Sequence, residues 1–465
     1  MAESERYVHI QTFGCQMTLY DPERMLQVLG EDGYASTEDP ARADLILLNT
    51  CSVREKAEHK MLSALGRYHR LKEFNDELVL GVTGCVATQE RERLFKKVPY
   101  LDLVAGPDNI AQLPEMVRSA RGSRERAIET RFFNKREYDW IPLEPQNRGQ
   151  VSAMLTIMKG CNKFCSFCVV PFTRGREVSK PASLIVEEVT RLVECGVPEV
   201  MLLGQNVNSY GNDRPGEPDF AELLALVNEV RGLERIRFTT SHPWDCTDAL
   251  VESFSGHLDK LCEYFHLPVQ SGSNSMLEKM RRGYTLESYL ERIDALRTAC
   301  PDIALSTDII VGFPGETEEQ HAATLALLER VRYGSICAFT YSERPGTAAA
   351  RLTDDVPVAV KKARLKDVLE IQNRVTHELL KERFEGATVE VLVEGLSSKA
   401  SRPEVDSIFS TQMTGRTRTN TVVNFERGGD CSFLVGDVVE IAIDEVNAHS
   451  LHGRVVRNVR SSRAA

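Results

Sequence analysis

Long apolar runs alternate with helix-like segments over the first 120 or so residues. The apolar runs are continuous, which is typical of strands buried on both faces of a parallel sheet. These runs are residues 8–13, 44–51 and 77–85. We therefore predict an open parallel α/β sheet over residues 5–121.

Residues 21–33 and 54–72, between the apolar runs, have the pattern of helices. We expect Asp21 to cap the first helix, Pro22 to occupy its first turn and Gly33 to end it.

Residues 122–146 are polar and charged and are predicted to be a linker. The strand–helix alternation then resumes and predicts a second domain over residues 147–378. Its apolar runs are residues 152–160, 199–207, 235–241, 264–270, 304–313 and 335–342. Helices are expected near residues 182–195, 218–231, 247–255, 286–299 and 317–332. Six such units predict a partial (β/α)6 barrel, whose active site would lie at the C-terminal ends of its strands.

The pattern changes again near the end of the chain. Residues 358–384 predict one long charged helix. Five short strands with turns between them are then expected, at residues 388–395, 408–417, 421–425, 437–448 and 451–456. Many short strands in so few residues predict a small β-barrel over residues 380–458.

Composition narrows the class of protein. The N-terminus has no apolar signal segment and no run approaches 18 apolar residues, so we expect a cytoplasmic protein that does not enter a membrane. Twelve cysteines in a reducing compartment favour metal binding or catalysis over disulfides. The net charge of −11 argues against a basic nucleic-acid coat but leaves a local RNA site open.

Three cysteines follow the apolar runs of the first domain. Cys15, Cys51 and Cys85 each fall where a predicted strand ends. Such strand ends converge on one crevice in open α/β sheets, so these thiols are candidates to share a metal cluster. The alternative is that they are buried structural cysteines.

Three more cysteines follow the first strand of the second domain. Cys161, Cys165 and Cys168 form a CxxxCxxC motif. Three thiolates can hold three irons of a 4Fe–4S cluster and leave one iron open for a catalytic ligand. A zinc site would need a fourth ligand, and Cys195 and His242 are distant in the sequence. The remaining cysteines are expected to be packing residues: Cys195, Cys246, Cys262, Cys300, Cys337 and Cys431.

These motifs resemble the methylthiotransferase family of the radical S-adenosylmethionine (SAM) superfamily. The resemblance rests on the cysteine motif with Phe167, and on QTFGCQM, LLNTCSVREKAEHK, CVVPFTRGREVSKP, HLPVQSGSNSMLEKMRRGYT and TDIIVGFPGET. GRTRTNTVVNF is similar to the C-terminal RNA-binding barrel of that family, called TRAM. The sequence departs from the family at Thr18, where Asn is usual, and at CVAT in residues 85–88, where CMAQ is common.

The resemblance implies an activity. Its tRNA-modifying branch adds a methylthio group to C2 of an isopentenylated adenosine at position 37 of tRNA. Two 4Fe–4S clusters and SAM would be the cofactors, with Cys161, Cys165 and Cys168 holding the radical-generating cluster. Cys15, Cys51 and Cys85 would hold the cluster used for sulfur insertion.

The same resemblance implies partners. They are a tRNA anticodon stem-loop that bears the isopentenylated adenosine, and a reducing electron donor such as flavodoxin or ferredoxin. We expect a monomer. Two alternatives remain open, which are methylthiolation of a ribosomal protein side chain and a non-catalytic iron–sulfur protein that binds RNA.

Further residues are candidates for cofactor and RNA binding. Polar groups that follow strands, with Phe167 beside the cluster, are the SAM candidates: Phe167, Gly204, Gln205, Asn206, His266, Gln270 and Asp308. Arginines and one asparagine are the RNA candidates, since arginine pairs with phosphate and stacks on bases: Arg174, Arg176, Arg281, Arg282, Arg416, Arg418 and Asn420. Lys180 is a further candidate for phosphate contact, and Phe425 is either a stacking residue or part of the core.

Overall fold

The N-terminal part of the chain forms one parallel sheet, as predicted. In the computed structural model the described residues are 6–14, 16–52, 55–122, 125–134, 138, 140–141, 150–397, 400, 411–427 and 432–460. The strand order is β2-β1-β3-β4-β5-β6, and every recorded neighbour pair is parallel. The strands are β1 (Arg6–Phe13), β2 (Tyr34–Ser36), β3 (Leu45–Thr50), β4 (Val79–Thr83), β5 (Leu103–Ala105) and β6 (Ala127–Glu129).

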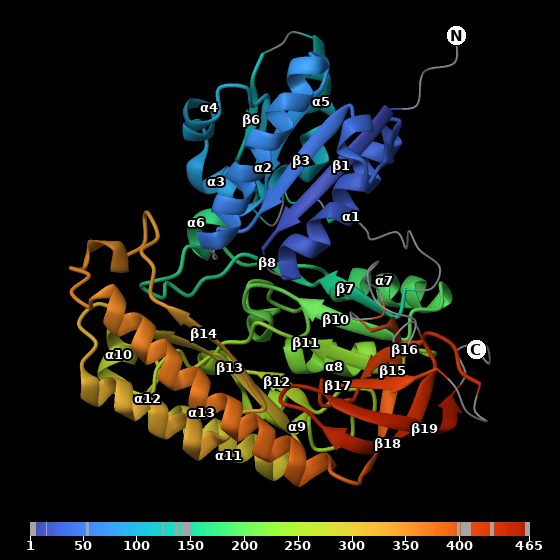
Figure 1. The fold of residues 1–465 in the computed structure, drawn as a ribbon, viewed down its shortest axis with the longest axis vertical. Helices are drawn as coiled ribbons and strands as arrows, with labels where there is room; N and C mark the ends of the chain where they lie inside the picture. Colours follow the sequence, from blue (N-terminus) through green and yellow to red (C-terminus); the bar gives the residue numbers. More distant parts are fainter. Residues whose placement is uncertain are drawn as a thin grey trace. The chain divides into compact units, whose positions relative to one another are not determined.

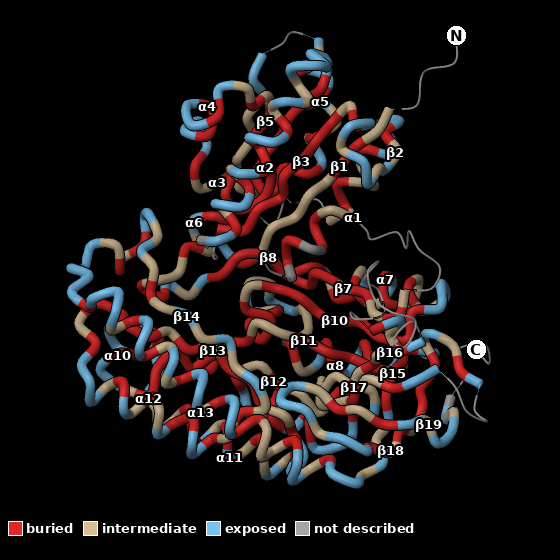
Figure 2. The backbone as a smooth tube through the Cα atoms, in the orientation of Figure 1, coloured by how far each residue is buried: buried red, intermediate tan, exposed pale blue. Residues whose placement is uncertain are grey.

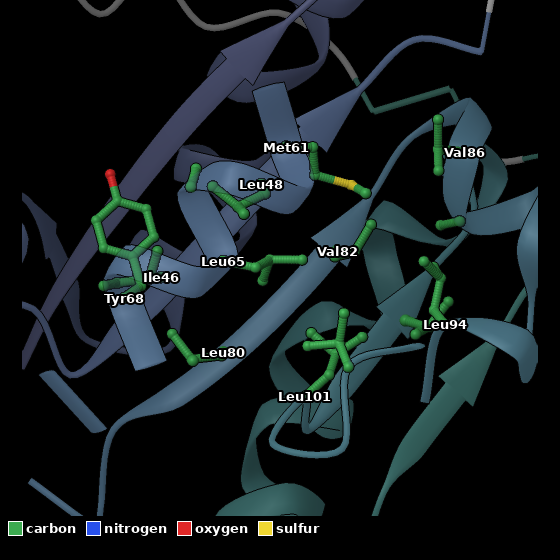
Figure 3. Packing of buried hydrophobic residues seen from close by; sticks show 14 of the residues in the cluster. Ile46, Leu48, Met61, Leu65, Tyr68, Leu80, Val82, Val86, Leu94 and Leu101 are labelled. Carbon is green, nitrogen blue, oxygen red and sulfur yellow. The ribbon is translucent and has the colours of Figure 1, made fainter. Parts of the chain in front are cut away.

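Helices cover both faces of this sheet (Figure 1). They are α1 (Gln16–Glu31), α2 (Glu55–Phe74), α3 (Cys85–Glu90), α4 (Arg93–Lys97) and α5 (Leu113–Gly122). Successive residues of β3 point to opposite faces, so Ile46 packs with α2 while Leu45 packs with α1 and α5. Figure 3 shows the first of these two cores, which contains Met61 and Leu65 of α2 together with Leu48 of β3. Strands buried on both faces explain the continuous apolar runs in the sequence.

The first helix begins earlier than its sequence indicates. It starts at Gln16, so Asp21 is not its cap and Pro22 lies inside it. The predicted cap is therefore wrong, whereas Gly33 does follow the end of the helix, with φ +83°.

The central strands are the six that were predicted. One sheet has the order β11-β10-β7 and another the order β12-β13-β14. A parallel bridge between Ile236 and Leu261 joins the two, so the strands follow one another in chain order, as in a partial barrel. The strands are β7 (Ser152–Thr156), β10 (Glu199–Leu203), β11 (Arg235–Phe238), β12 (Tyr264–His266), β13 (Ala304–Val311) and β14 (Ser335–Thr340).

Helices accompany these strands, and Figure 2 shows exposed residues along the covering helices and buried residues in the strands. The helices are α7 (Ala182–Glu194), α8 (Phe220–Asn228), α9 (Asp248–Glu252), α10 (Asn274–Lys279), α11 (Leu286–Ala299), α12 (Glu318–Val331) and α13 (Val358–Phe384). The long helix at 358–384 has the predicted bounds. Thr317 caps α12 with a reciprocal capping box to Gln320.

The last five strands close into a barrel of order β15-β16-β17-β19-β18. They are β15 (Thr388–Leu396), β16 (Gln412–Arg416), β17 (Val422–Glu426), β18 (Val438–Val446) and β19 (Leu451–Arg460). Val391, Phe425 and Ile441 are among its core residues. Phe425 is fully buried, so it belongs to the core rather than to a stacking surface.

The chain divides into two compact units. One contains residues 1–146, 156–180 and 342–350, and the other contains residues 147–155, 181–341 and 351–465. Both motifs of three cysteines therefore belong to the first unit. Among the described residues, none of the helices is both long and apolar enough to cross a bilayer.

Candidate functional site

Neighbouring strands carry the first group of cysteines. β1, β3 and β4 are consecutive in the sheet. Cys51 directly follows β3, and Cys85 is the first residue of α3, two positions after β4. Both are buried. Cys15, the third predicted ligand, lies outside the described residues.

A glycine allows the chain to turn sharply before Cys85. Gly84 has φ +85°, a conformation that favours glycine. A Cβ at this position would lie 2.5 Å from Oδ1 of Asn49 and 2.8 Å from the carbonyl oxygen of Thr50. The TGC sequence therefore brings the backbone before Cys85 against the end of β3, which leads to Cys51.

A buried amide supports the same edge. Asn49, on β3, donates its Nδ2 to the carbonyl oxygen of Thr18 at 2.8 Å. That carbonyl lies four residues before Pro22, which has no N–H to donate to it. Asn49 therefore supplies the hydrogen bond that the helix itself lacks.

Arg174 connects this edge to the segment that carries the second group of cysteines. Its Nε donates to Sγ of Cys85 at 3.2 Å. Its Nη2 donates to Oδ2 of Asp21, inside α1, at 2.8 Å. All three residues are buried, with 5% of Arg174 exposed. The sequence offered no signal for Asp21 beyond helix capping, because its partner lies 153 residues away.

A closed loop carries Cys161, Cys165 and Cys168. The antiparallel pair β8 (Met158–Lys159) and β9 (Val178–Ser179) joins its two ends. Inside that pair, the N–H of Cys161 donates to the carbonyl of Gly175 at 3.2 Å. The N–H of Cys168 donates to the carbonyl of Cys165 at 3.0 Å, which forms a turn between these two cysteines.

Side chains hold the loop as well. The Glu177 carboxylate accepts from the N–H of Asn162 at 3.0 Å and from its Nδ2 at 3.1 Å. Gly160, just before Cys161, has φ +75°, and a Cβ there would lie 2.0 Å from the carbonyl oxygen of Arg176. The loop geometry is therefore set by the residues that flank the motif.

The three thiols of this loop are close to one another. Burial, together with the neighbouring Cys168 and Cys165, raises the pKa of Cys161 to about 12 against a hydrogen bond from the N–H of Lys163. Binding of a metal to Cys161 therefore requires loss of the thiol proton, which coordination itself favours.

Three converging cysteines are a donor set that fits a 4Fe–4S cluster with one open iron. Among the described side chains, no three of His, Cys, Asp or Glu lie as close as ligands of a single metal ion must. The ligands of a 4Fe–4S cluster lie farther apart than those of a single metal ion, because each thiolate binds a different iron.

The cysteines expected to be packing residues divide into two kinds. Cys246, Cys262 and Cys300 are buried, as expected. Cys195 and Cys337 are exposed, which contradicts the expectation for these two. Cys431 lies outside the described residues.

The SAM candidates near residue 204 follow β10. The carbonyl of Gly204 accepts from the hydroxyl of Thr240, whose φ is +64°. Asn206 is buried and donates its Nδ2 to Asp245 at 2.8 Å, while its Oδ1 has no hydrogen-bond partner among the described residues. A buried acceptor without a donor is rare in native proteins, and it is the kind of group that an amine-bearing ligand satisfies. Gln205 lies between these two residues and is half-buried.

Three other SAM candidates meet where β12 ends beside the middle of β13. His266 Nδ1 lies 2.8 Å from Oγ of Ser306, and its Nε2 lies 3.6 Å from Oδ1 of Asp308. The N–H of Gln270 donates to the carbonyl of Asp308 at 2.9 Å, and Gln270 has φ +78°. Such backbone strain in a residue with a side chain is often found at ligand sites. The structure thus brings His266, Gln270 and Asp308 together.

Exposed aromatic residues on the cysteine loop were missed by the sequence analysis. Phe164 and Phe172 are 42% and 47% exposed, and their rings meet edge to face at 6.5 Å. The guanidinium of Arg176 lies 4.5 Å from the centre of the Phe164 ring. Phe167, the predicted neighbour of the cluster, is half-buried. Nothing in the sequence separates an exposed phenylalanine from a core one.

The RNA candidates of the cysteine segment and the central strands differ in exposure. Arg176 and Arg281 are exposed. Arg174 and Lys180 are buried. Arg282 is also buried and donates to the carbonyl of Pro268 at 2.6 Å. These three buried side chains do not lie where a phosphate can reach them.

The barrel candidates form a turn that is bound to the central strands. The guanidinium of Arg418 pairs with the Glu263 carboxylate at 2.8 Å. Arg416 pairs with Glu394 at 3.1 Å, and Asn420 has φ +66° in the turn. The buried Arg237 of β11 donates to the carbonyls of Thr417 and Arg418, both at 2.8 Å. In this structure the turn therefore holds the barrel in place.

Three family models match successive parts of the chain. They are Uncharacterized protein family UPF0004 at residues 7–106, Radical SAM superfamily at residues 155–328 and TRAM domain at residues 382–456. Among solved structures, the radical S-adenosylmethionine methyltransferase TsrM from Kitasatospora setae matches with a TM-score of 0.55 at 14% identity. That match covers 74% of this chain and 77% of TsrM, and supports the fold alone.

Curated relatives match almost the whole chain. The tRNA-2-methylthio-N(6)-dimethylallyladenosine synthase of Myxococcus xanthus is 49% identical over 96% of this chain and 93% of its own length. The protein of the same name from Geobacter sulfurreducens is 46% identical over 98% of this chain and 99% of its own length. Similarity at this level over the full length places the chain in the tRNA-2-methylthio-N(6)-dimethylallyladenosine synthase family of radical SAM enzymes.

Proposed function

We propose that this protein is a radical SAM methylthiotransferase that converts N6-isopentenyladenosine at position 37 of tRNA into its 2-methylthio derivative. The observation that carries the proposal is the presence of both cysteine groups in one compact unit. α3, which begins at Cys85, packs against α6 (Val170–Thr173), which begins two residues after Cys168. The names of the full-length relatives support the tRNA substrate over the ribosomal-protein and non-catalytic alternatives.

The residues that hold the cofactors are part of this proposal. Cys161, Cys165 and Cys168 would bind the radical-generating cluster, and Cys15, Cys51 and Cys85 the cluster used for sulfur insertion. Reductive cleavage of SAM at such a site supplies a 5′-deoxyadenosyl radical. This chemistry suits C2 of adenine, which is unactivated, so that acid–base catalysis alone would not replace its hydrogen by sulfur. One SAM would donate the methyl group to the sulfur and a second SAM would supply the radical. The C2 hydrogen would leave with 5′-deoxyadenosine, the C2–S bond would form as the sulfur leaves its iron, and the one remaining electron would return to the iron–sulfur cluster.

Residues of the chain would bind and orient SAM. We assign cofactor contacts to Phe167, Gly204, Gln205, Asn206, His266, Gln270 and Asp308. Two of these assignments are supported by Oδ1 of Asn206, which has no hydrogen-bond partner in the part of the chain that the structure describes, and by the strained backbone of Gln270. The electron donor would be a low-potential protein such as flavodoxin or ferredoxin, and the enzyme would act as a cytoplasmic monomer.

Of the RNA-binding residues predicted from the sequence, we propose those whose basic side chains are exposed. Arg176 and Arg281 are exposed, and Arg176 lies over the exposed ring of Phe164. Arginine and aromatic rings together bind unstacked bases and phosphates of single-stranded RNA loops. Arg416 and Asn420 stay candidates, whereas the buried Arg174 and Arg282 and the paired Arg418 have protein partners instead.

Anaerobic reconstitution with iron and sulfide, followed by reaction with SAM, a reductant and isopentenylated tRNA, tests the function. Mass spectrometry of the nucleosides should show the 2-methylthio product, and tRNA without the isopentenyl group is the control substrate. Unchanged N6-isopentenyladenosine, in protein that carries its iron, would contradict the proposal.

Two cysteine variants separate the two proposed clusters. Cys165→Ala should abolish both 5′-deoxyadenosine and product, because it removes a ligand of the radical cluster. Cys85→Ala should still form 5′-deoxyadenosine but lose methylthio transfer. Cys195→Ala, which removes an exposed thiol, is the matched control and should retain both activities.

A further inference from the structure

A buried arginine touches one of the proposed ligands of the sulfur-insertion cluster. Arg174 donates its Nε to Sγ of Cys85 at 3.2 Å and its Nη2 to Asp21 at 2.8 Å. The side chains of Arg174 and Asp21 are 7% and 2% exposed. The guanidinium is therefore enclosed, and the carboxylate fixes which of its N–H groups faces the sulfur.

The position of Arg174 along the chain is as informative as its contacts. It follows directly after α6, and its N–H donates to the carbonyl of Val170 at 2.8 Å. The same segment begins with the cysteine loop of the radical motif. One short segment thus carries the proposed ligands of one cluster and a cation that contacts a ligand of the other.

We propose that Arg174, oriented by Asp21, is a positioning residue that stabilises the reduced form of the sulfur-insertion cluster through Cys85. This inference rests on the proposed function, because it requires that Cys85 binds iron. A neutral thiol is a weak acceptor for a buried guanidinium, whereas an iron-bound thiolate is a good one. Hydrogen bonds and positive charge at cluster sulfurs favour the more negative, reduced state and so raise the reduction potential.

Arginine is better suited to this role than lysine. Its planar fork donates to two acceptors at fixed angles, and it remains charged when buried. A lysine would keep the charge but could not hold Asp21 and the sulfur in the same geometry. Substitution of Arg174 by lysine therefore keeps the positive charge but loses the planar two-donor geometry, whereas substitution by glutamine removes the charge as well.

The test uses the sulfur-insertion cluster alone. The full-length variant Cys161→Ala, Cys165→Ala, Cys168→Ala is reconstituted with iron and sulfide, and the cluster is titrated with EPR detection. Arg174→Gln in this background should shift the midpoint potential to a more negative value. Arg174→Lys should shift it by less. Arg93→Gln, which removes an exposed positive charge of α4 in the same compact unit, should leave it unchanged.

Each outcome has a separate meaning. A cluster that forms in Arg174→Gln with an unchanged potential would overturn the inference but not the proposed function. Failure of the triple-cysteine variant to bind any cluster would overturn the sulfur-insertion site itself. Loss of iron in both Arg174→Gln and Arg174→Lys, in protein whose iron-free form stays folded, would make Arg174 necessary for holding the cluster in any oxidation state and would overturn the inference. Unfolding of both iron-free variants would make Arg174 a folding residue and overturn it.

Discussion

At the scale of single residues, one amide group compensates for a proline inside a helix. Pro22 cannot donate to the carbonyl of Thr18, and the buried Asn49 donates to it instead. An unpaired buried carbonyl costs about 1–3 kcal/mol. The stability of this sheet edge therefore depends on a side chain from a neighbouring strand.

Replacing Asn49 tests whether its side-chain amide compensates for the N–H that Pro22 lacks. Asn49→Ala should destabilise the iron-free protein by about 1–3 kcal/mol in chemical denaturation. In a Pro22→Ala background the new N–H can satisfy Thr18, so the cost of Asn49→Ala should be smaller. Equal costs in the two backgrounds would contradict this explanation, and Asn75→Ala, at an exposed position, is the control.

The same residues show the limit of sequence reasoning. Asp21 before Pro22 is typical of a helix start, yet the helix begins at Gln16. The reason is tertiary, since Asn49 and Arg174 supply partners that lie far away in the sequence. Cys51 and Cys85 were correctly predicted to follow strands because each preceding apolar run has a strong local pattern, whereas no local pattern indicates the Arg174–Cys85 contact.

At the scale of elements, the shape of the cysteine loop depends on the short antiparallel pair β8–β9 and on Gly160. β8 and β9 close the loop, and Gly160 lies where any Cβ would collide with the backbone at Arg176. The six central strands and helix α13 were predicted because each has a strong local pattern. The two-residue strands β8 and β9 were not, because their pairing joins residues about 20 positions apart.

An alanine at Gly160 should open this loop. Its Cβ would lie 2.0 Å from the Arg176 carbonyl, and φ of +75° disfavours any residue with a side chain. We expect Gly160→Ala to lose the iron and the visible absorbance of the radical cluster. The background is a protein that lacks Cys85, so that the other cluster does not contribute.

Gly66→Ala is the matched control for that substitution. Gly66 lies within α2, and a Cβ there meets nothing within 4 Å. It should keep its iron and gain about 0.5–1 kcal/mol of stability. Full iron binding in Gly160→Ala would show that the loop tolerates a shifted backbone.

At the scale of the whole molecule, two buried arginines connect the C-terminal barrel to the central strands within one compact unit. Arg235 donates to the carbonyl of Arg416 at 2.7 Å, and Arg237 donates to the two carbonyls that follow. The turn that resembled an RNA contact is thus also a structural joint. The sequence alone could not distinguish RNA binding from a structural role, because a turn that contains arginine and asparagine is compatible with both.

Removing Arg237 tests this joint. Arg237 Nε pairs with Glu199 at 2.8 Å, and both side chains are buried. Arg237→Met leaves that carboxylate without its cation and frees two carbonyls of the turn, so we expect a loss of about 3–5 kcal/mol in the free energy of unfolding. The double variant with Glu199→Met should recover part of this loss, because no charge is then left buried. Arg457→Met removes an exposed ion pair of the barrel and should change stability little. If limited proteolysis released the barrel no faster in Arg237→Met than in Arg457→Met, the joint would have to depend on other contacts.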